Sequence, residues 1–139
     1  DGQHQADDIE KMLLVLKSGK ADIVSGSRFL KGSADNMSPM RKLLLQVARY
    51  VNYFFTGLLL TDAHNGLRAM TKEADIQIKL QENGMAHATE ILYQVKKKKL
   101  RHAEVPVNIR YTKYSKKKGQ SLLSGFRIFF DLLLNKIFK

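Results

Sequence analysis

The sequence contains no cysteine, and this absence excludes several classes of protein at once. A disulfide framework, a thiolate zinc site and a cysteine nucleophile are all ruled out, and the composition suits a reducing compartment. No uninterrupted apolar run reaches the roughly 18 residues that a transmembrane helix needs. The first residues lack the basic and apolar regions of a signal peptide. We therefore expect any membrane contact to be at the surface.

Acidic residues are also scarce, with 13 Asp plus Glu against 24 Lys plus Arg, for a net charge of +11. Such a chain should be drawn to phosphates, whether of nucleic acid, lipid headgroups or nucleotides, and charge alone does not choose among them. With 139 residues, 44% of them hydrophobic, the chain is long enough for one compact domain and too short for two of ordinary size.

The common short signatures of phosphate and zinc chemistry are missing. There is no glycine-rich loop of the Walker or GxGxxG type, so an ATPase or a dehydrogenase has no support. The four histidines are irregularly spaced and form no HExxH pattern. We expect His87 and His102 to be structural or solvated, whereas His4 and His64 lie in two of the sequence blocks described below, where they would line the site.

Hydrophobic periodicity indicates a mixed α/β fold. Helical spacing predicts four helices, at about residues 7–16, 39–58, 72–80 and 86–98. Apolar and alternating runs predict strands at residues 21–26 and 105–111, the second near a sheet edge because it contains Pro106. Residues 29–36 lack any period and residues 61–70 are rich in turn formers, so we predict loops there.

The helix predicted over residues 39–58 has the strongest pattern, beginning with Ser38 as N-cap and Pro39 in the first turn. One side carries only apolar residues, and we expect this side to face the core. They are Leu43, Leu44, Val47, Val51, Phe54, Phe55 and Leu58. The opposite side, which we expect to be solvated, carries Lys42, Gln46, Arg49, Tyr53 and Thr56.

Residues 121–139 form a strongly amphipathic segment. Its apolar stripe contains Leu122, Phe126, Phe129, Phe130, Leu133 and Ile137. Lysines lie just upstream, a combination typical of a helix that lies in the membrane plane beside anionic headgroups. The alternative is that the stripe packs on the core of the domain itself.

Several blocks of sequence, taken in order, carry a resemblance to a known family. They are DGQHQADDI, ADIVSGSRF, TGLLLTDAHNGLRAM, NGMAHATEI and EVPVNIRYTKYSKKKGQS. Together they resemble the family 2 glycosyltransferases, in particular dolichyl-phosphate mannosyltransferase and other polyprenyl-phosphate sugar transferases. The resemblance implies a GT-A fold of which residues 1–120 are the acceptor-side half, followed by the amphipathic segment 121–139. The nucleotide-binding half is expected to precede Asp1.

The resemblance also implies a metal site and a pair of catalytic carboxylates. Asp1 is similar to the second Asp of the family's Asp-x-Asp motif, and with Gln3 it would hold Mg²⁺ or Mn²⁺ on the diphosphate of the sugar nucleotide. Asp62 lies in a loop similar to the one that faces sugar and acceptor. Glu90 matches an acidic position bordering the acceptor site, although a lipid phosphate is already an anion and needs little general-base help.

Six basic or amide side chains are implied as substrate-binding residues. They are Arg28, Asn65, Arg68, Arg110, Lys113 and Lys118. Arg28 follows a predicted strand, where a planar guanidinium suits bidentate contact with phosphate. The plain alternatives are a surface ion pair for Arg28, a capped turn for the Asp62 loop and solvated lysines after the last strand.

Taken together, the resemblance implies an inverting, metal-dependent hexosyltransferase acting on a nucleotide sugar of the GDP-mannose or UDP-glucose type. The acceptor would be a polyprenyl phosphate, at the cytoplasmic face of a membrane, with the full-length protein peripheral or anchored. We expect these 139 residues alone to be inactive, with exposed apolar surface that a homo-oligomer would hide. The alternatives are a basic nucleic-acid-binding module, which lacks a recognisable motif, and a membrane-associated scaffold without catalysis.

Overall fold

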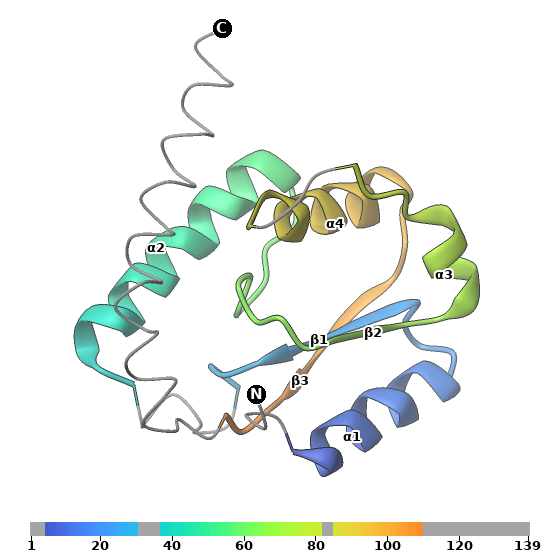
Figure 1. The fold of residues 1–139 in the computed structure, drawn as a ribbon, viewed down its shortest axis with the longest axis horizontal. Coiled ribbons are helices and arrows are strands. Elements are labelled where there is room, and N and C mark those ends of the chain that lie inside the picture. The colour runs from blue at the N-terminus through green and yellow to red at the C-terminus, as the bar shows by residue number, and fades with distance from the viewer. Residues whose placement is uncertain (1–4, 31–36, 82–84, 110–139) are drawn as a thin grey trace, which may run out of the picture.

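The computed structural model describes residues 5–30, 37–81 and 85–109, and over these ranges the predicted mixed α/β architecture is confirmed (Figure 1). Within these ranges four helices and three strands follow one another. They are α1 (Ala6–Lys17), β1 (Ile23–Ser27), α2 (Pro39–Thr56), β2 (Arg68–Met70), α3 (Lys72–Gln77), α4 (Met85–Lys97) and β3 (His102–Pro106).

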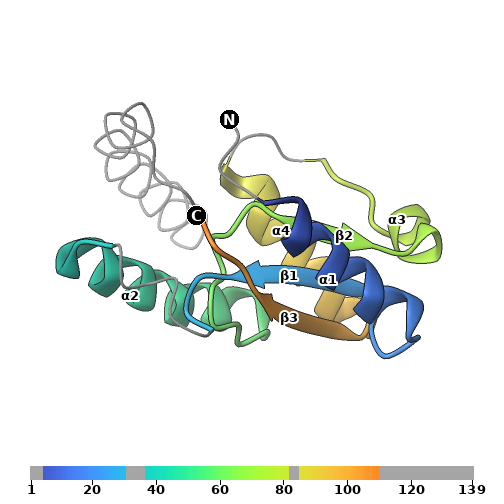
Figure 2. The same ribbon diagram turned by 90° about the horizontal axis from the view of Figure 1, so that it is seen from below.

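The three strands form one sheet in the order β2-β1-β3. β1 pairs antiparallel with β2, placing Ile23 opposite Met70, and parallel with β3, placing Ile23 opposite His102. Helix α1 covers one face of the sheet and α4 the other, while α2 lies on the α4 side (Figures 1 and 2). Because β1 and β3 are parallel, their carboxyl ends meet at one edge of the sheet, where ligands commonly bind in open α/β folds.

The central strand separates two apolar cores, since successive strand residues point to opposite faces. Val24 packs with Met12 of α1 and with Val105 and Val107. Ile23 faces the other way and packs with side chains of α4, chiefly Ile91 and Val95. All five residues of β1 are buried, which makes this strand the centre of the described fold.

The predicted start of α2 is confirmed, and the helix ends two residues earlier than predicted, at Thr56. The Ser38 hydroxyl accepts a hydrogen bond from the Arg41 backbone N–H at 3.4 Å, and Pro39 begins the helix. Gly57 ends it with a left-handed φ of 68°. No helix among residues 5–30, 37–81 and 85–109 is both long and apolar enough to cross a bilayer.

Three predicted boundaries need correction. The loop predicted over residues 61–70 contains β2, which has only three residues and so leaves no periodic signal. Helix α3 ends at Gln77 rather than near Leu80, because Ile78 adopts an extended conformation. The last strand begins earlier than predicted, since its pairing with β1 starts at His102, and it ends at Pro106.

The orientation predicted for α2 is wrong. Its buried side chains are Leu45, Ala48, Asn52 and Thr56, while Leu43, Val47 and Phe54, which we expected in the core, are exposed. The two buried polar side chains bond to each other, since Asn52 Nδ2 donates to the Thr56 hydroxyl at 3.4 Å. The Thr56 hydroxyl in turn donates to the Asn52 backbone carbonyl at 2.8 Å and accepts from the Leu58 N–H at 3.2 Å. Because their polar atoms have hydrogen-bond partners, Asn52 and Thr56 can be buried without a large energetic cost.

Candidate active site at the carboxyl end of strand β1

A buried ion pair lies directly after β1. The Arg28 guanidinium donates to both carboxylate oxygens of Asp62, from Nε to Oδ2 at 2.6 Å and from Nη2 to Oδ1 at 2.8 Å. The Arg28 backbone N–H also donates to Oδ2, at 3.0 Å. The side chains of Arg28 and Asp62 are only 7% and 1% exposed, so the alternative that Arg28 forms an ordinary ion pair at the surface is wrong.

This geometry defines what Asp62 does in the structure. Both of its oxygens hold Arg28, and a bidentate pair fixes the plane of the guanidinium as well as its position. Asp62 therefore acts here as the residue that orients Arg28. A direct catalytic role for Asp62 stays a prediction.

A second carboxylate, from β3, organises the loop that carries Asp62. Glu104 accepts hydrogen bonds from the Thr61 N–H at 2.9 Å, from the Thr61 hydroxyl at 2.9 Å and from the Asp62 N–H at 3.2 Å. The Thr61 hydroxyl in turn lies 2.6 Å from the Ser27 hydroxyl at the end of β1. The network thus ties the loop to both parallel strands.

Sequence reasoning missed Ser27, Thr61 and Glu104. Glu104 and Thr61 are 43 positions apart in the chain, so spacing gives no sign of their contact. All three lie within the resembling blocks, but only Glu104 carried a signal of its own, a carboxylate between the apolar Ala103 and Val105. Such a group needs a partner when it is partly buried, and here the partners are backbone N–H groups.

Asn65 and Arg68, both predicted to bind substrate, come together beside the ion pair. Asn65 is 2% exposed, and its side-chain oxygen accepts from the Leu67 N–H at 3.0 Å. Arg68 donates to the Ala63 carbonyl at 3.4 Å, and its burial lowers its pKa while Asp62 acts against that shift. Within the described residues, Asn65 Nδ2 and Arg68 Nε are buried without a hydrogen-bond partner.

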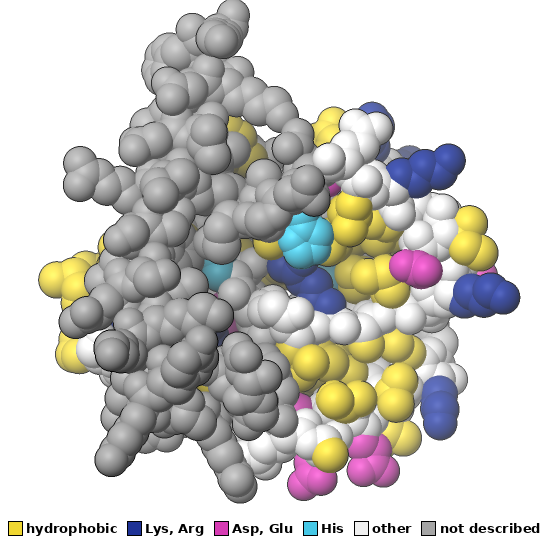
Figure 3. Space-filling view, viewed as in Figure 1, with side chains coloured by type: hydrophobic (Ala, Val, Ile, Leu, Met, Phe, Trp, Pro, Cys, Tyr) yellow, Lys and Arg dark blue, Asp and Glu magenta, His cyan; other side chains and the backbone are white. Residues whose placement is uncertain are grey.

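These two residues line a cavity of about 390 Å³ between the loop and α4. The other lining residues are His64, Gly66, Met70, His87, Ala88 and Ile91. Burial lowers the pKa of His64 to about 4, so its ring is neutral near neutral pH. On the face of the molecule shown in Figure 3, histidine and basic side chains gather near the centre, among hydrophobic groups.

Glu90 has a different environment from the other predicted site residues. Its carboxylate accepts from the Gln81 N–H at 3.0 Å and from the Gln94 side-chain amide at 3.3 Å. It thereby holds the segment before α4, and it does not line the cavity that contains Asn65 and Arg68. The catalytic role predicted for Glu90 stays a prediction.

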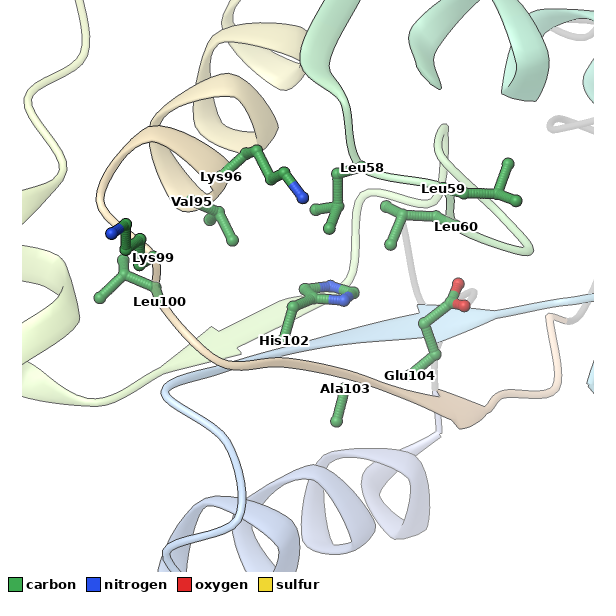
Figure 4. A pocket seen from close by; sticks show the side chains of 10 residues that line it. All are labelled: Leu58, Leu59, Leu60, Val95, Lys96, Lys99, Leu100, His102, Ala103 and Glu104. Atoms are coloured by element: carbon green, nitrogen blue, oxygen red, sulfur yellow. The ribbon is translucent and has the colours of Figure 1, made fainter. Parts of the chain in front are cut away.

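A larger cavity, of about 560 Å³, lies between β3, the carboxyl end of α4 and the Leu58–Leu60 segment (Figure 4). Glu104 is at one end of it, so solvent reaches the edge of the Thr61 network. His102, also in its wall, lies 3.0 Å from the Ser25 hydroxyl through Nε2. Burial lowers the pKa of His102 to about 4.

The remaining predicted site residues lie outside the described residues. These are Asp1 and Gln3, predicted for the metal, and Arg110, Lys113 and Lys118, predicted for phosphate, together with the amphipathic segment 121–139. Within the described part of the chain no group of three or more potential ligand side chains could hold a metal ion. The metal site therefore stays a prediction from the sequence.

Comparison with known proteins identifies the relatives of this chain. Its sequence is 33% identical over 142 residues to the UDP-N-acetylglucosamine–dolichyl-phosphate N-acetylglucosaminyltransferase of Methanococcus voltae, a match that covers the whole chain and 57% of that enzyme. It is 27% identical over 130 residues to the low-salt glycan biosynthesis hexosyltransferase Agl6 of Haloferax volcanii, over 91% of the chain and 30% of that enzyme. The chain is thus similar to proteins named as sugar transferases, which agrees with the predicted resemblance to the family 2 glycosyltransferases.

A third relative, an uncharacterized protein of Methanocaldococcus jannaschii, is 33% identical over 99% of the chain and 58% of its own length. The glycosyltransferase-like chain thus spans a little over half the length of the two relatives that are 33% identical to it. No protein-family model and no solved structure matches the chain. The GT-A architecture stays a prediction.

Proposed function

We propose that the full-length protein transfers a sugar from a nucleotide sugar to a polyprenyl phosphate, and that this chain supplies the acceptor side of the site. Two relatives are named as sugar transferases, and one of them acts on dolichyl phosphate. The observation that carries the proposal is the buried Arg28–Asp62 pair at the carboxyl end of β1, with a second, half-buried arginine, Arg68, beside it.

Arginines in such a setting suit a phosphate. A guanidinium held in a fixed plane presents its donors in the geometry that phosphate oxygens accept, and low solvent exposure strengthens the contact. Asp62 fixes Arg28, and Glu104 fixes the backbone that carries Asp62. Arg28 would therefore meet the acceptor phosphate without first having to be ordered.

We propose an in-line reaction at this site. An oxygen of the acceptor phosphate attacks the anomeric carbon in line as the bond to the nucleotide diphosphate breaks, which inverts the configuration at that carbon. Because the nucleophile is already an anion, the step needs positioning and charge stabilisation more than a general base. Arg28 and Arg68 would offset the negative charge that two phosphate groups bring together.

The proposal includes a divalent metal on the sugar-nucleotide diphosphate. Asp1 and Gln3 offer the oxygen donors that Mg²⁺ and Mn²⁺ prefer, and they are the residues that would hold the ion. When bound, such an ion would stabilise the leaving diphosphate as a Lewis acid. Arg110, Lys113 and Lys118 would complete the basic surface around the phosphates.

The site of action would be the cytoplasmic face of a membrane, where a polyprenyl phosphate presents its headgroup. The net charge of +11 favours approach to anionic lipid surfaces. We propose that the 139 residues alone are inactive, because they span a little over half the length of two relatives. The resemblance to named transferases favours this function over a nucleic-acid-binding module or a scaffold.

Transfer of labelled sugar by the full-length protein tests the proposal. UDP-N-acetylglucosamine, UDP-glucose and GDP-mannose would each be offered with a short-chain polyprenyl phosphate. We expect one donor to give a labelled lipid, and Arg28→Lys to lower the rate by about 100-fold, the scale for loss of one positioned charge-stabilising donor. Arg101→Ala is the matched control, since Arg101 makes a similar bidentate pair with Asp22 but is exposed.

Comparison of the two variants separates the specific loss of a phosphate-binding arginine from the general effect of losing an ion pair. Arg101→Ala should leave the rate within a factor of about two, because an exposed ion pair contributes little. An active Arg28→Lys protein, with the rate of the wild type, would contradict the role assigned to Arg28. A wild-type protein that labels no lipid with any of the three donors would contradict the proposed function.

A further inference from the structure

The larger cavity, between β3, the carboxyl end of α4 and the Leu58–Leu60 segment, is separate from the candidate active site. Neither Arg28 nor Asp62 lines it. Its volume of about 560 Å³ lies within the range of small-molecule binding sites, which is roughly 300–1,000 Å³. The cavity is therefore large enough for a ligand of its own.

Most of the cavity wall is aliphatic, and the packing of the core holds it in place. Leu60 is 2% exposed and packs with Leu92 of α4. Leu58 and Leu100 both pack against the cluster that contains Val95. Because these side chains are already fixed by their neighbours, the wall is formed before any ligand arrives. An aliphatic group is the kind of ligand that fits it.

Two lysines supply the positive charge of the cavity. Lys96 reaches from α4 toward Leu58 (Figure 4), and its stem passes over Gly57, where an added Cβ would lie 3.7 Å from both Cγ and Cε of the lysine. Lys99 lines the cavity one turn further on. Neither ammonium group has a hydrogen-bond or ion-pair partner among the described residues. Both are therefore available to an anion.

The backbone at Lys99 is unusual. This residue has a left-handed φ of 55°. The Lys99 N–H donates to the Lys96 carbonyl at 3.1 Å and the Leu100 N–H donates to the Val95 carbonyl at 3.0 Å, which is the pattern of a Schellman motif. Glycine is the usual residue at this position, because it has no Cβ to strain the left-handed conformation. A lysine kept there despite the strain points to a use for its side chain.

The floor of the cavity, formed by β3, adds no further cation. Burial lowers the pKa of His102 to about 4, so its ring is neutral near neutral pH. The Glu104 carboxylate already accepts hydrogen bonds from Thr61 and Asp62. Positive charge in this cavity is thus confined to the end that carries the two lysines.

We propose that this cavity binds an aliphatic anion, a chain of about eight carbons that ends in one carboxylate or phosphate group. The head would lie beside Lys96 and Lys99, and the chain would follow the aliphatic wall toward Glu104. There it would displace the solvent that reaches the Thr61 network. The inference goes beyond the proposed function and does not depend on it, because binding is measured without sugar transfer.

Isothermal titration calorimetry of the full-length protein with octanoate and with octyl phosphate tests the proposal, and the two probes distinguish the head groups. Octanol, which lacks the anionic group, and inorganic phosphate, which lacks the chain, are the controls. We expect at least one probe to bind, and both controls to bind about tenfold more weakly or less. Lengthening the chain from four to eight carbons should tighten binding by about two- to fourfold for each CH₂ group.

Paired lysine variants locate the anionic head. Lys96→Gln/Lys99→Gln removes both cations at exposed positions, and we expect it to weaken binding by about tenfold. Lys97→Gln/Lys98→Gln is the matched control, since it removes the same charge from the same end of α4 at residues that do not line the cavity. It should bind like the wild type. Lys99→Gly should raise the melting temperature, because it relieves the left-handed strain, and still weaken binding.

Hydrogen exchange locates the chain of the ligand. The amides of Thr61 and Asp62, which donate to Glu104, should exchange about threefold more slowly or less when the probe is bound, because less solvent reaches them. The amides of α3, on another part of the surface, should exchange at an unchanged rate.

Four outcomes would overturn the proposal. One is the absence of saturable binding of either probe, which would mean that another part of the full-length protein fills the cavity. The second is equal binding by Lys96→Gln/Lys99→Gln and its matched control. The third is binding of octanol as tight as that of octanoate and octyl phosphate. The last is slower exchange elsewhere in the chain with no change at Thr61 and Asp62.

Discussion

Glu104 provides the sharpest test of how the site is held together. Replacing it with alanine leaves three donors without their partner: the Thr61 N–H, the Thr61 hydroxyl and the Asp62 N–H. Each buried unsatisfied donor costs about 1–3 kcal/mol. Because Glu104 borders an open cavity, water would replace part of this loss, and we expect Glu104→Ala to lower the free energy of unfolding by about 2–4 kcal/mol.

Urea denaturation of the full-length protein, followed by circular dichroism, measures this effect. Glu104→Gln keeps one acceptor oxygen, so it should be destabilised by about half as much as the alanine variant. Asp22→Asn is the matched control, because Asp22 accepts both side-chain and backbone hydrogen bonds from Arg101 at an exposed position. A Glu104→Ala protein as stable as Asp22→Asn would refute the view that Glu104 organises the loop.

Three further predictions concern stability. Gly26→Ala would place its Cβ 2.7 Å from Val107 Cγ1, and the resulting overpacking should destabilise the protein by about 1–3 kcal/mol in a thermal melt, unlike Gly66→Ala, which meets nothing within 4 Å. Arg28→Met or Asp62→Leu alone should lower the free energy of unfolding, measured in urea, by about 3–5 kcal/mol, because each leaves an unpaired buried charge. The double variant should lose clearly less than either single variant. A double variant that is less stable than both would contradict the prediction. The pKa of His64 and of His102 is lowered to about 4, so the folded state binds fewer protons than the unfolded state below about pH 6.5. The free energy of unfolding should therefore fall as the pH drops from neutral toward 4. A urea midpoint that is constant over this pH range would contradict the prediction.

Much of the fold could be predicted from the sequence because its signals are local. The Ser38-Pro39 start and the periodic apolar residues predicted α2, and the apolar run at residues 21–26 predicted β1. Strand β2 could not be predicted, because its three residues are stabilised by pairing with β1 rather than by their own pattern. Periodicity also could not show which side of α2 is buried, since it reports an apolar side and not what that side contacts.

The candidate site was predictable only where a family motif marked it. Arg28, Asp62, Asn65 and Arg68 were found in this way, and the structure brings them together. Their mutual contacts were not foreseen, because Arg28 and Asp62 are 34 positions apart in the chain. Glu104 begins one of the resembling blocks but was assigned no role, and its function as a hydrogen-bond acceptor emerges only when β3 is placed beside β1.

The most direct test of the central claim is the choice of acceptor. The full-length protein would be given its labelled nucleotide sugar together with polyprenyl phosphate, or with the corresponding polyprenol, which lacks the phosphate. If Arg28 and Arg68 receive an acceptor phosphate, labelled lipid should form only with polyprenyl phosphate. Equal labelling of the polyprenol, or transfer to neither lipid, would contradict the account.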